Sequence, residues 1–161
     1  STPMTIESLT DAWIAELLSM AKHVENPRAK LRQDRRQERC DYRVVSEDGT
    51  HLFTLFTRQS TMLSESFSAG LRWHAKSGEE IILVRYNGGS HEHENDLEGD
   101  KISYATHIHR ATERYAAMNK KVDAYAESSP RYGTLNGALH CLVKDCNIMG
   151  LSTEPEEPQL F

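Results

Sequence analysis

Four of the eight histidines in this 161-residue chain fall into two His-x-His pairs that are separated by a polar, turn-rich segment. The pairs are His91-x-His93 and His107-x-His109. Imidazole titrates near neutral pH and is the commonest metal ligand among protein side chains. Histidines at this density therefore mark the segment as the best candidate for a functional site.

Two kinds of chemistry fit the paired histidines. Residues two apart in an extended chain point to the same side, so each pair can present its imidazoles together. They could bind a divalent metal ion, zinc foremost, through His91, His93, His107 and His109. They equally suit a metal-free site, where one neutral histidine accepts a proton and a charged one returns it. Loop histidines that make only structural hydrogen bonds are the third interpretation.

The local backbone decides which partner the second pair has. If residues 107–109 were helical, His107 and His109 would diverge by about half a turn. His109 and Glu113, four residues apart, would then form the natural pair. The spacing of Ile108, Ala111, Tyr115 and Met118 is typical of a helix, so this alternative stays open.

Cationic and aromatic side chains flank the histidines. Arg85, Tyr86 and Asn87 end an expected strand and lead into the histidine segment. An arginine there could bind a phosphate with two hydrogen bonds, and Tyr86 could stack on a base. Alternatively, Arg85 pairs with an acid on a neighbouring strand and Tyr86 lies in the core. Arg110 and Arg114 add positive charge beside the second histidine pair.

One stretch of the chain resembles a motif of small, uncharacterised bacterial proteins. It comprises His93-x-Asn95, a turn at Gly99, His107-x-His109 and Glu113-x-Tyr115. The resemblance covers roughly residues 50–118, including a preceding β-meander, and this chain lacks the Asn-Pro-Asp-Gly turn of the pattern. It implies no particular activity. It does imply one functional unit, made of His93, Asn95, His107, His109 and Glu113.

Charge is unevenly distributed along the chain. The formal net charge is −5, yet residues 28–39 contain six basic and two acidic residues. An acidic total argues against a protein that coats nucleic acid all over, but leaves room for one basic face. Arg32, Arg35 and Arg36 could bind phosphates or an acidic partner protein. The alternative is a solvated helix, against which the acidic tail could dock.

Composition and motifs exclude several classes of protein. The three cysteines lack C-x-x-C spacing, and neither a nucleotide-binding glycine loop nor a serine nucleophile motif is present. No apolar run approaches the ~20 residues that span a bilayer, and no signal peptide is apparent. We therefore expect a cytoplasmic protein without a membrane partner. It should form one domain over residues 4–151, with a flexible acidic tail over residues 152–161.

The periodicity of apolar residues predicts an α+β fold. An N-terminal helix over residues 6–24 and a second helix over 27–39 precede four strands at 42–45, 52–57, 67–75 and 81–86. A fifth strand at 101–106, a helix from 108 and a helix over 135–146 follow. Short polar turns join the strands, so we expect the N-terminal helix to pack on a four- to five-stranded antiparallel meander, followed by C-terminal helices.

The leading functional hypothesis is a small hydrolase that cleaves a phosphodiester in RNA or a nucleotide, as bacterial toxins and phage-conflict proteins do. His93 and either His107 or His109 would be its acid and base, and Arg85 or Arg110 would neutralise the phosphate. The full predicted set adds Glu113 as catalytic and Tyr86, Asn87, Asn95, Arg110, Arg32, Arg35 and Arg36 as substrate-binding residues.

Two alternatives come from other classes of protein. One is a non-enzymatic interaction protein, such as an inhibitor or antitoxin-like partner from a mobile element. The other is a metal-binding protein without catalysis. The sequence leaves the oligomeric state open.

Overall fold

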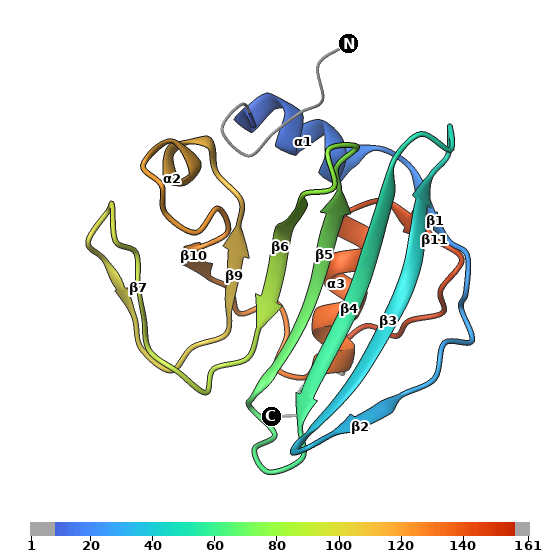
Figure 1. Ribbon diagram of the computed structural model, residues 1–161. Coiled ribbons are helices and arrows are strands. Elements are labelled where there is room, and N and C mark those ends of the chain that lie inside the picture. The colour runs from blue at the N-terminus through green and yellow to red at the C-terminus, as the bar shows by residue number, and fades with distance from the viewer. Residues whose placement is uncertain (1–8, 157–161) are drawn as a thin grey trace.

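A computed structural model describes residues 9–156 of the chain. It is an α+β protein with one large, mostly antiparallel sheet and three helices in the described residues, which confirms the predicted class. Figure 1 shows the arrangement. The helices are α1 (Asp11–Ser19), α2 (Glu113–Ala117) and α3 (Leu135–Asp145). The strands are β1 (Lys22–Val24), β2 (Arg32–Asp34), β3 (Gln37–Ser46), β4 (Leu52–Ser60), β5 (Phe67–His74), β6 (Glu80–Asn87), β7 (His93–Glu94), β8 (Lys101–Ile102), β9 (His107–Arg110), β10 (Tyr125–Ser128) and β11 (Ile148–Met149).

The centre of the sheet is the meander β3 to β6, whose strands pair in sequence order. Each of the four predicted strands lies largely within one of them. The full order is β10-β9-β6-β5-β4-β3-β1-β11, with β2 on β3, and β1–β11 is its one parallel pair among the described strands. Strands β7 and β8 form a separate two-stranded sheet.

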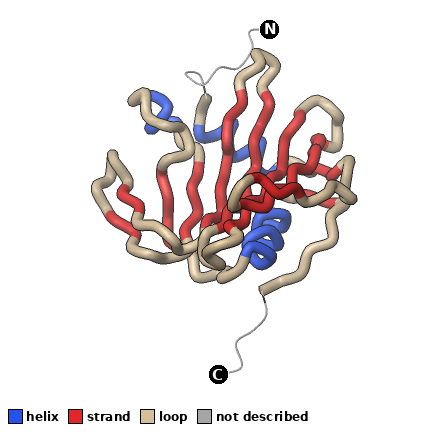
Figure 2. Tube along the Cα trace, turned by 60° about the horizontal axis from the view of Figure 1, so that its bottom comes forward, coloured by secondary structure: helices blue, strands red, loops and turns tan. Residues whose placement is uncertain are grey.

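One face of the sheet is covered by helix α3, whose range matches the predicted helix over 135–146 (Figures 1 and 2). Alternate strand residues such as Leu55 and Leu71 point to this face and are fully buried with Leu142 of α3. Helix α1 extends the same core, and its Trp13 packs edge-on against Trp73 with ring centroids 6.0 Å apart. The main helical cover is thus α3, rather than the N-terminal helix.

The N-terminal region differs most from the prediction. The first helix ends at Ser19, Val24 lies in β1, and the part of the predicted helix before residue 9 lies outside the described residues. The second predicted helix is wrong, because residues 32–46 form the hairpin of β2 and β3. This segment offers a helix few apolar side chains to bury, whereas pairing with β3 satisfies its backbone. Arg39 also pairs across the hairpin with Asp34 at 2.9 Å.

The segment around the second histidine pair also differs. Only Lys101–Ile102 of the predicted strand over 101–106 is extended, and it pairs with β7. The strand added to the meander is β9, which pairs with β6. Helix α2 begins at Glu113 after Thr112, whose side chain accepts a hydrogen bond from the Tyr115 N–H. The alternative in which His109 and Glu113 pair along one helix is therefore wrong, because His109 lies in β9 and helix α2 begins only at Glu113.

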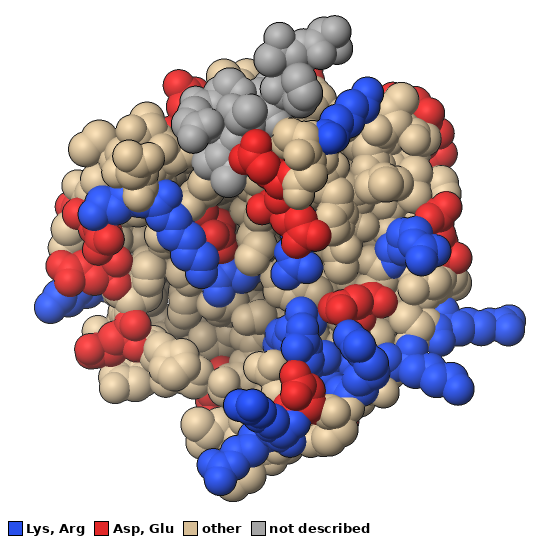
Figure 3. All heavy atoms as spheres, in the orientation of Figure 1, with Lys and Arg blue, Asp and Glu red and all other residues tan. Residues whose placement is uncertain are grey.

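The second face of the central sheet is open to solvent within the described structure. It carries the polar residues that alternate with the core positions, among them Arg58, Arg72 and Arg85. Figure 3 views this face and shows lysine and arginine side chains gathered over its lower half. The face extends through β6 and β9 to the histidine pairs.

Candidate functional site: a histidine pocket on the open face

The extended conformation of β9 directs His107 and His109 to the open face. Ile108 between them points into the core and is 4% exposed. In the register of β9 with β6, Asn87 lies opposite His107 and Arg85 lies opposite His109. The strand thus places two imidazoles beside one amide and one guanidinium group.

The third histidine comes from the β7–β8 hairpin, which is fastened to β10 by Asn95. The Asn95 Oδ1 accepts from the Ala126 N–H at 2.8 Å, and its Nδ2 donates to the Ala126 carbonyl at 2.8 Å. Nδ2 also donates to Asp100 at 3.1 Å, and Oδ1 lies 2.9 Å from His93 Nε2. Asn95 was predicted to bind substrate. Its side chain is only 1% exposed, and its hydrogen bonds instead hold His93 in position.

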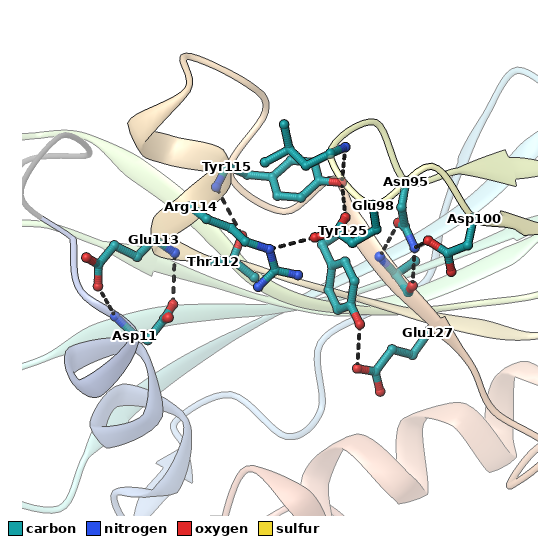
Figure 4. A network of polar contacts seen from close by, with 12 residues as sticks. Asp11, Asn95, Glu98, Asp100, Thr112, Glu113, Arg114, Tyr115, Tyr125 and Glu127 are labelled. Atoms are coloured by element: carbon teal, nitrogen blue, oxygen red, sulfur yellow. Dashed lines mark hydrogen bonds and ion pairs between the residues drawn. The ribbon is translucent and has the colours of Figure 1, made fainter.

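The hairpin is also supported from helix α2 (Figure 4). The Tyr115 hydroxyl donates to Glu98 at 2.7 Å and accepts from the Leu97 N–H at 3.2 Å. Arg114 donates to the same carboxylate at 2.6 Å. These contacts hold the hairpin loop in place, and they direct the charge of Arg114 toward Glu98 rather than toward the histidines.

Three of the four paired histidines meet. The ring centroid of His93 lies 5.9 Å from that of His107 and 4.7 Å from that of His109, and the last two are 4.9 Å apart. The two pairs therefore approach each other through His93. His91 lines the same pocket but is exposed to solvent.

The histidines line a pocket of about 280 Å³. Its cations are Arg58 from β4 and Arg85 from β6. Arg85 Nε donates to the buried carboxylate of Asp123 at 2.8 Å, and Arg58 donates to Asp41 at 3.1 Å. Each guanidinium group is thereby held in a defined orientation. Other pocket residues include Gln37, Ser68, Asn87 and Gly88.

Hydrogen bonds define the tautomers of the two β9 histidines. The Nδ1 of His107 lies 2.8 Å from the Ala105 carbonyl, and the Nδ1 of His109 lies 3.1 Å from that of Asp123. A carbonyl oxygen only accepts, so the proton is assigned to Nδ1 and each Nε2 is left with a lone pair. Burial lowers the pKa of His107; burial, reinforced by the charge of Arg85, lowers the pKa of His109 to about 3. Both rings are therefore neutral at pH 7.

Two predicted site residues lie on the opposite face of the sheet. Tyr86 is 1% exposed, and its hydroxyl donates to the Asp145 carboxylate below the sheet. Arg110 pairs in register with the core residue Val84, which places it on the same face as Tyr86. Burial raises the pKa of Tyr86, and the charge of Arg110 offsets only part of this rise. The predictions that Tyr86 stacks on a base and that Arg110 binds phosphate in this pocket are wrong, because residues next to each other in a strand face opposite ways.

Glu113 lies outside the pocket, at the start of α2 (Figure 4). Its carboxylate accepts from the Asp11 N–H at 3.1 Å, and the Asp11 carboxylate accepts from the Glu113 N–H at 2.8 Å. The two acids thus cap the starts of α1 and α2 reciprocally. The unit implied by the resemblance is assembled without Glu113.

The predicted phosphate-binding arginines lie on the β2–β3 hairpin. Arg32 is on β2 and pairs with Asp41 at 3.2 Å, whereas Arg35 and Arg36 form the exposed tip. The next residue, Gln37, lines the histidine pocket. Arg58 was not predicted as a site residue. Its one signal in the sequence is its position two residues after the apolar Phe56, on the same side of an extended strand.

Metal coordination was the other predicted use of the histidines. Within residues 9–156, no three His, Cys, Asp or Glu side chains form a group that could hold a metal ion. The predicted ligand set of His91, His93, His107 and His109 does not form such a group.

Fold and site together define an α+β protein whose open antiparallel sheet carries a recessed histidine pocket. Residues 9–148 match the model of DUF6978, a family of unknown function, and the chain belongs to this family. This confirms the resemblance to an uncharacterised family. The comparisons find no match among curated proteins or solved structures.

None of the helices within residues 9–156 has the length and apolar character needed to cross a bilayer.

Proposed function

We propose that this protein cleaves phosphodiester bonds in RNA by metal-independent acid–base catalysis. The observation that supports the proposal is the convergence of His93, His107 and His109 in one pocket with Arg58 and Arg85. Cleavage of RNA needs a base, an acid and positive charge near the phosphate. This pocket contains side chains of each kind.

The reaction begins at the 2′-hydroxyl of the nucleotide whose 3′-phosphate is bound. A base removes the hydroxyl proton while O2′ attacks phosphorus, and the bond from phosphorus to O5′ breaks. The leaving O5′ receives a proton from the acid. The products of this step are a 2′,3′-cyclic phosphate and a 5′-hydroxyl. In a second step the two histidines exchange roles: water loses a proton to one and attacks phosphorus, the bond from phosphorus to O2′ breaks, and O2′ takes a proton from the other, which gives a 3′-phosphate.

His107 has the properties of the base. Its Nδ1 proton is held by the Ala105 carbonyl, its Nε2 has a lone pair, and its lowered pKa keeps the ring neutral. We assign His93 as the acid, because its Nε2–H donates a hydrogen bond to Asn95 Oδ1, which fixes the ring and leaves Nδ1 to carry the proton for the leaving oxygen. His109 packs edge-on against both rings and is a positioning residue.

Two arginines supply the positive charge. Arg85 and Arg58 line the pocket, and their ion pairs with Asp123 and Asp41 fix them before substrate arrives. Preorganised donors of this kind stabilise the charge that develops on the phosphate oxygens without reorganising during the reaction.

The test is cleavage of RNA and of 2′,3′-cyclic nucleotides by untagged protein in the presence of a chelator. His107→Asn is the informative variant, since an amide can still donate toward the Ala105 carbonyl while Nε2 is removed. We expect it to lower the cleavage rate by about a hundredfold or more. The matched control is His23→Asn, a half-exposed histidine beside Glu47.

Three results would contradict the proposal. The first is that the parent protein cleaves neither substrate. The second is equal activity in His107→Asn and the parent. The third is activity that is abolished by the chelator and restored by zinc, which would favour the metal-dependent alternative.

A further inference from the structure

We propose that the substrate is a single-stranded RNA whose backbone lies across the open face, from the tip of the β2–β3 hairpin to the histidine pocket. The assignment of RNA rests on the proposed function, because the reaction uses a 2′-hydroxyl. The path itself follows from the placement of polar side chains on the sheet.

A continuous row of hydrogen-bonding side chains crosses five strands. In the strand register, Arg39 lies opposite Arg58, Arg58 opposite Ser68, Ser68 opposite Asn87, and Asn87 opposite His107. Neighbouring strands are about 4.8 Å apart, so the row is roughly 19 Å long. It ends at the proposed base, which gives a bound chain a defined route to the reacting group.

The middle of this path carries two arginines fixed over one aromatic ring. The guanidinium groups of Arg58 and Arg72 lie 4.9 and 5.1 Å from the centroid of the Phe56 ring. Gly70 makes room for the ring, because a Cβ at this position would lie 2.2 Å from it. Phe56 is 4% exposed, so the arginines rather than the ring face a ligand. Guanidinium groups can both stack on unpaired bases and bind phosphates.

The tip of the β2–β3 hairpin provides cations that form no ion pair with the described part of the chain. Arg35 and Arg36 make no ion pair within residues 9–156, whereas the other arginines of the path pair with carboxylates. Arg35 has a φ of 56°, a left-handed conformation that favours glycine or asparagine in such turns. The Arg36 carbonyl accepts from the Thr61 N–H at 2.9 Å, which anchors the tip to the β4–β5 loop. An arginine kept in a strained, anchored turn suggests a functional role.

Charge on this face also favours a polyanion, although the whole chain is acidic. The proposed path is lined by seven arginines and by the four carboxylates that pair with five of them. Figure 3 shows basic side chains gathered on the lower half of this face. The arginines are Arg32, Arg35, Arg36, Arg39, Arg58, Arg72 and Arg85. A partner with regularly spaced phosphates can contact several of them at once.

The recessed histidines select a single strand over a duplex. His107 and His109 are only 3% and 6% exposed and sit in a pocket of about 280 Å³. A phosphate must therefore turn inward to reach His107. A flexible strand can make this turn, whereas a paired helix presents its backbone on a regular outer surface.

The test is binding of a short, unstructured 2′-O-methyl oligoribonucleotide, measured by fluorescence anisotropy at several salt concentrations. The methyl group removes the nucleophile, so binding is observed without cleavage. The variant is Arg35→Gln with Arg36→Gln. The matched control is Lys120→Gln with Lys121→Gln, which removes the same charge from the exposed loop between α2 and β10.

We expect the hairpin variant to weaken binding about tenfold and to flatten the salt dependence by roughly 0.7 for each lost phosphate contact. The lysine variant should bind like the parent. The path is overturned if both variants behave alike, if the parent does not bind the oligonucleotide, if a duplex binds as well as the single strand, or if polyglutamate binds equally well.

This experiment is independent of the proposed reaction. Hairpin-dependent binding without cleavage of ordinary RNA would uphold the path and overturn the reaction. Cleavage of RNA that the hairpin variant leaves unchanged, together with unchanged binding, would uphold the reaction and overturn the path.

Discussion

At the scale of single residues, burial determines the proton state of the β9 histidines. Their Nδ1 atoms are committed to backbone carbonyls, and their low exposure disfavours the charged form. Each ring therefore presents a lone pair at Nε2 rather than a proton. This state suits the proposed base, and it also makes the fold sensitive to acid.

His109 should make folding stability depend on pH. Unfolded, its ring takes up a proton near pH 6.5, whereas in the folded protein its pKa is lowered to about 3. The unfolded state thus binds more protons between these values, and the folded state loses stability as the pH falls from 6.5 toward 3. Between pH 6.5 and 4.5 we expect a loss on the order of 2 kcal/mol from this residue.

Urea unfolding at several pH values measures this contribution. His109→Asn removes the titrating ring, so its stability should fall less between pH 6.5 and 4.5 than that of the parent. His23→Asn should follow the parent. An equal loss of stability in His109→Asn and the parent would mean that His109 does not contribute to acid sensitivity.

Residue patterns narrowed the conformation of the second histidine pair to two alternatives, extended or helical. The structure shows the extended one, in which residues two apart point to the same side. Applied consistently, the same rule separates His109 from Arg110 and Arg85 from Tyr86. The prediction instead grouped these residues by closeness in sequence, and for that reason it assigned Arg110 and Tyr86 to the wrong face. Arg58 depends on the register of β4 with β5, which no local pattern reveals.

At the scale of elements, the meander was predictable and the basic hairpin was not. Strand β5 alternates apolar with polar residues, β4 and β6 contain short apolar runs, and polar turns bound all three, so these local signals agree with their tertiary environment. Residues 32–39 have no such alternation. Their conformation depends on pairing with the rest of β3 and on cross-strand ion pairs such as that of Arg39 with Asp34. The start of α2 likewise depends on Asp11, a partner 102 residues away.

The reciprocal cap between α1 and α2 gives a prediction about Glu113. Glu113→Ala removes an acceptor for the Asp11 N–H, so we expect it to lower the free energy of unfolding by about 1 kcal/mol. Asp11→Ala should have a similar effect, since it removes the acceptor for the Glu113 N–H. The double variant should lose less than the sum, because the two hydrogen bonds join the same two helix starts and losing one loosens the other. Cleavage of RNA should be unchanged in all three, since Glu113 lies outside the histidine pocket.

Urea unfolding and cleavage rates, measured on the same preparations, test both parts. A loss of cleavage in Glu113→Ala comparable to that in His107→Asn would place this carboxylate in the reaction. It would also restore the five-residue unit that the sequence resemblance implies. Additive losses of stability in the double variant would show that the two caps act independently.

At the scale of the whole molecule, the two faces of the sheet differ in what covers them. The covered face contains the core and α3, and the described part of the acidic tail docks there as well. Glu156 accepts from the Gly133 N–H at 2.8 Å and from Thr134 at the start of α3. The tail was expected to dock against the basic segment at residues 28–39, whereas Glu156 is anchored at the start of α3. The tail up to Glu156 is therefore fastened at α3, and within the described residues it makes no ion pair with the arginines of the open face.

This separation predicts that salt affects long and short substrates differently. A strand on the proposed path contacts cations at the hairpin tip, at Arg58 with Arg72, and at Arg85. Three phosphate contacts give a slope of about −2 in log affinity against log salt, so raising salt from about 50 to 200 mM should lower kcat/KM for RNA roughly 20-fold. A 2′,3′-cyclic mononucleotide reaches only the pocket, and its single contact predicts a loss of about threefold.

Steady-state rates for the two substrates in the parent protein measure the difference, and Arg35→Gln with Arg36→Gln should reduce the effect for RNA alone. If kcat/KM falls in parallel for both substrates, the salt effect arises within the histidine pocket and the open face does not guide the chain.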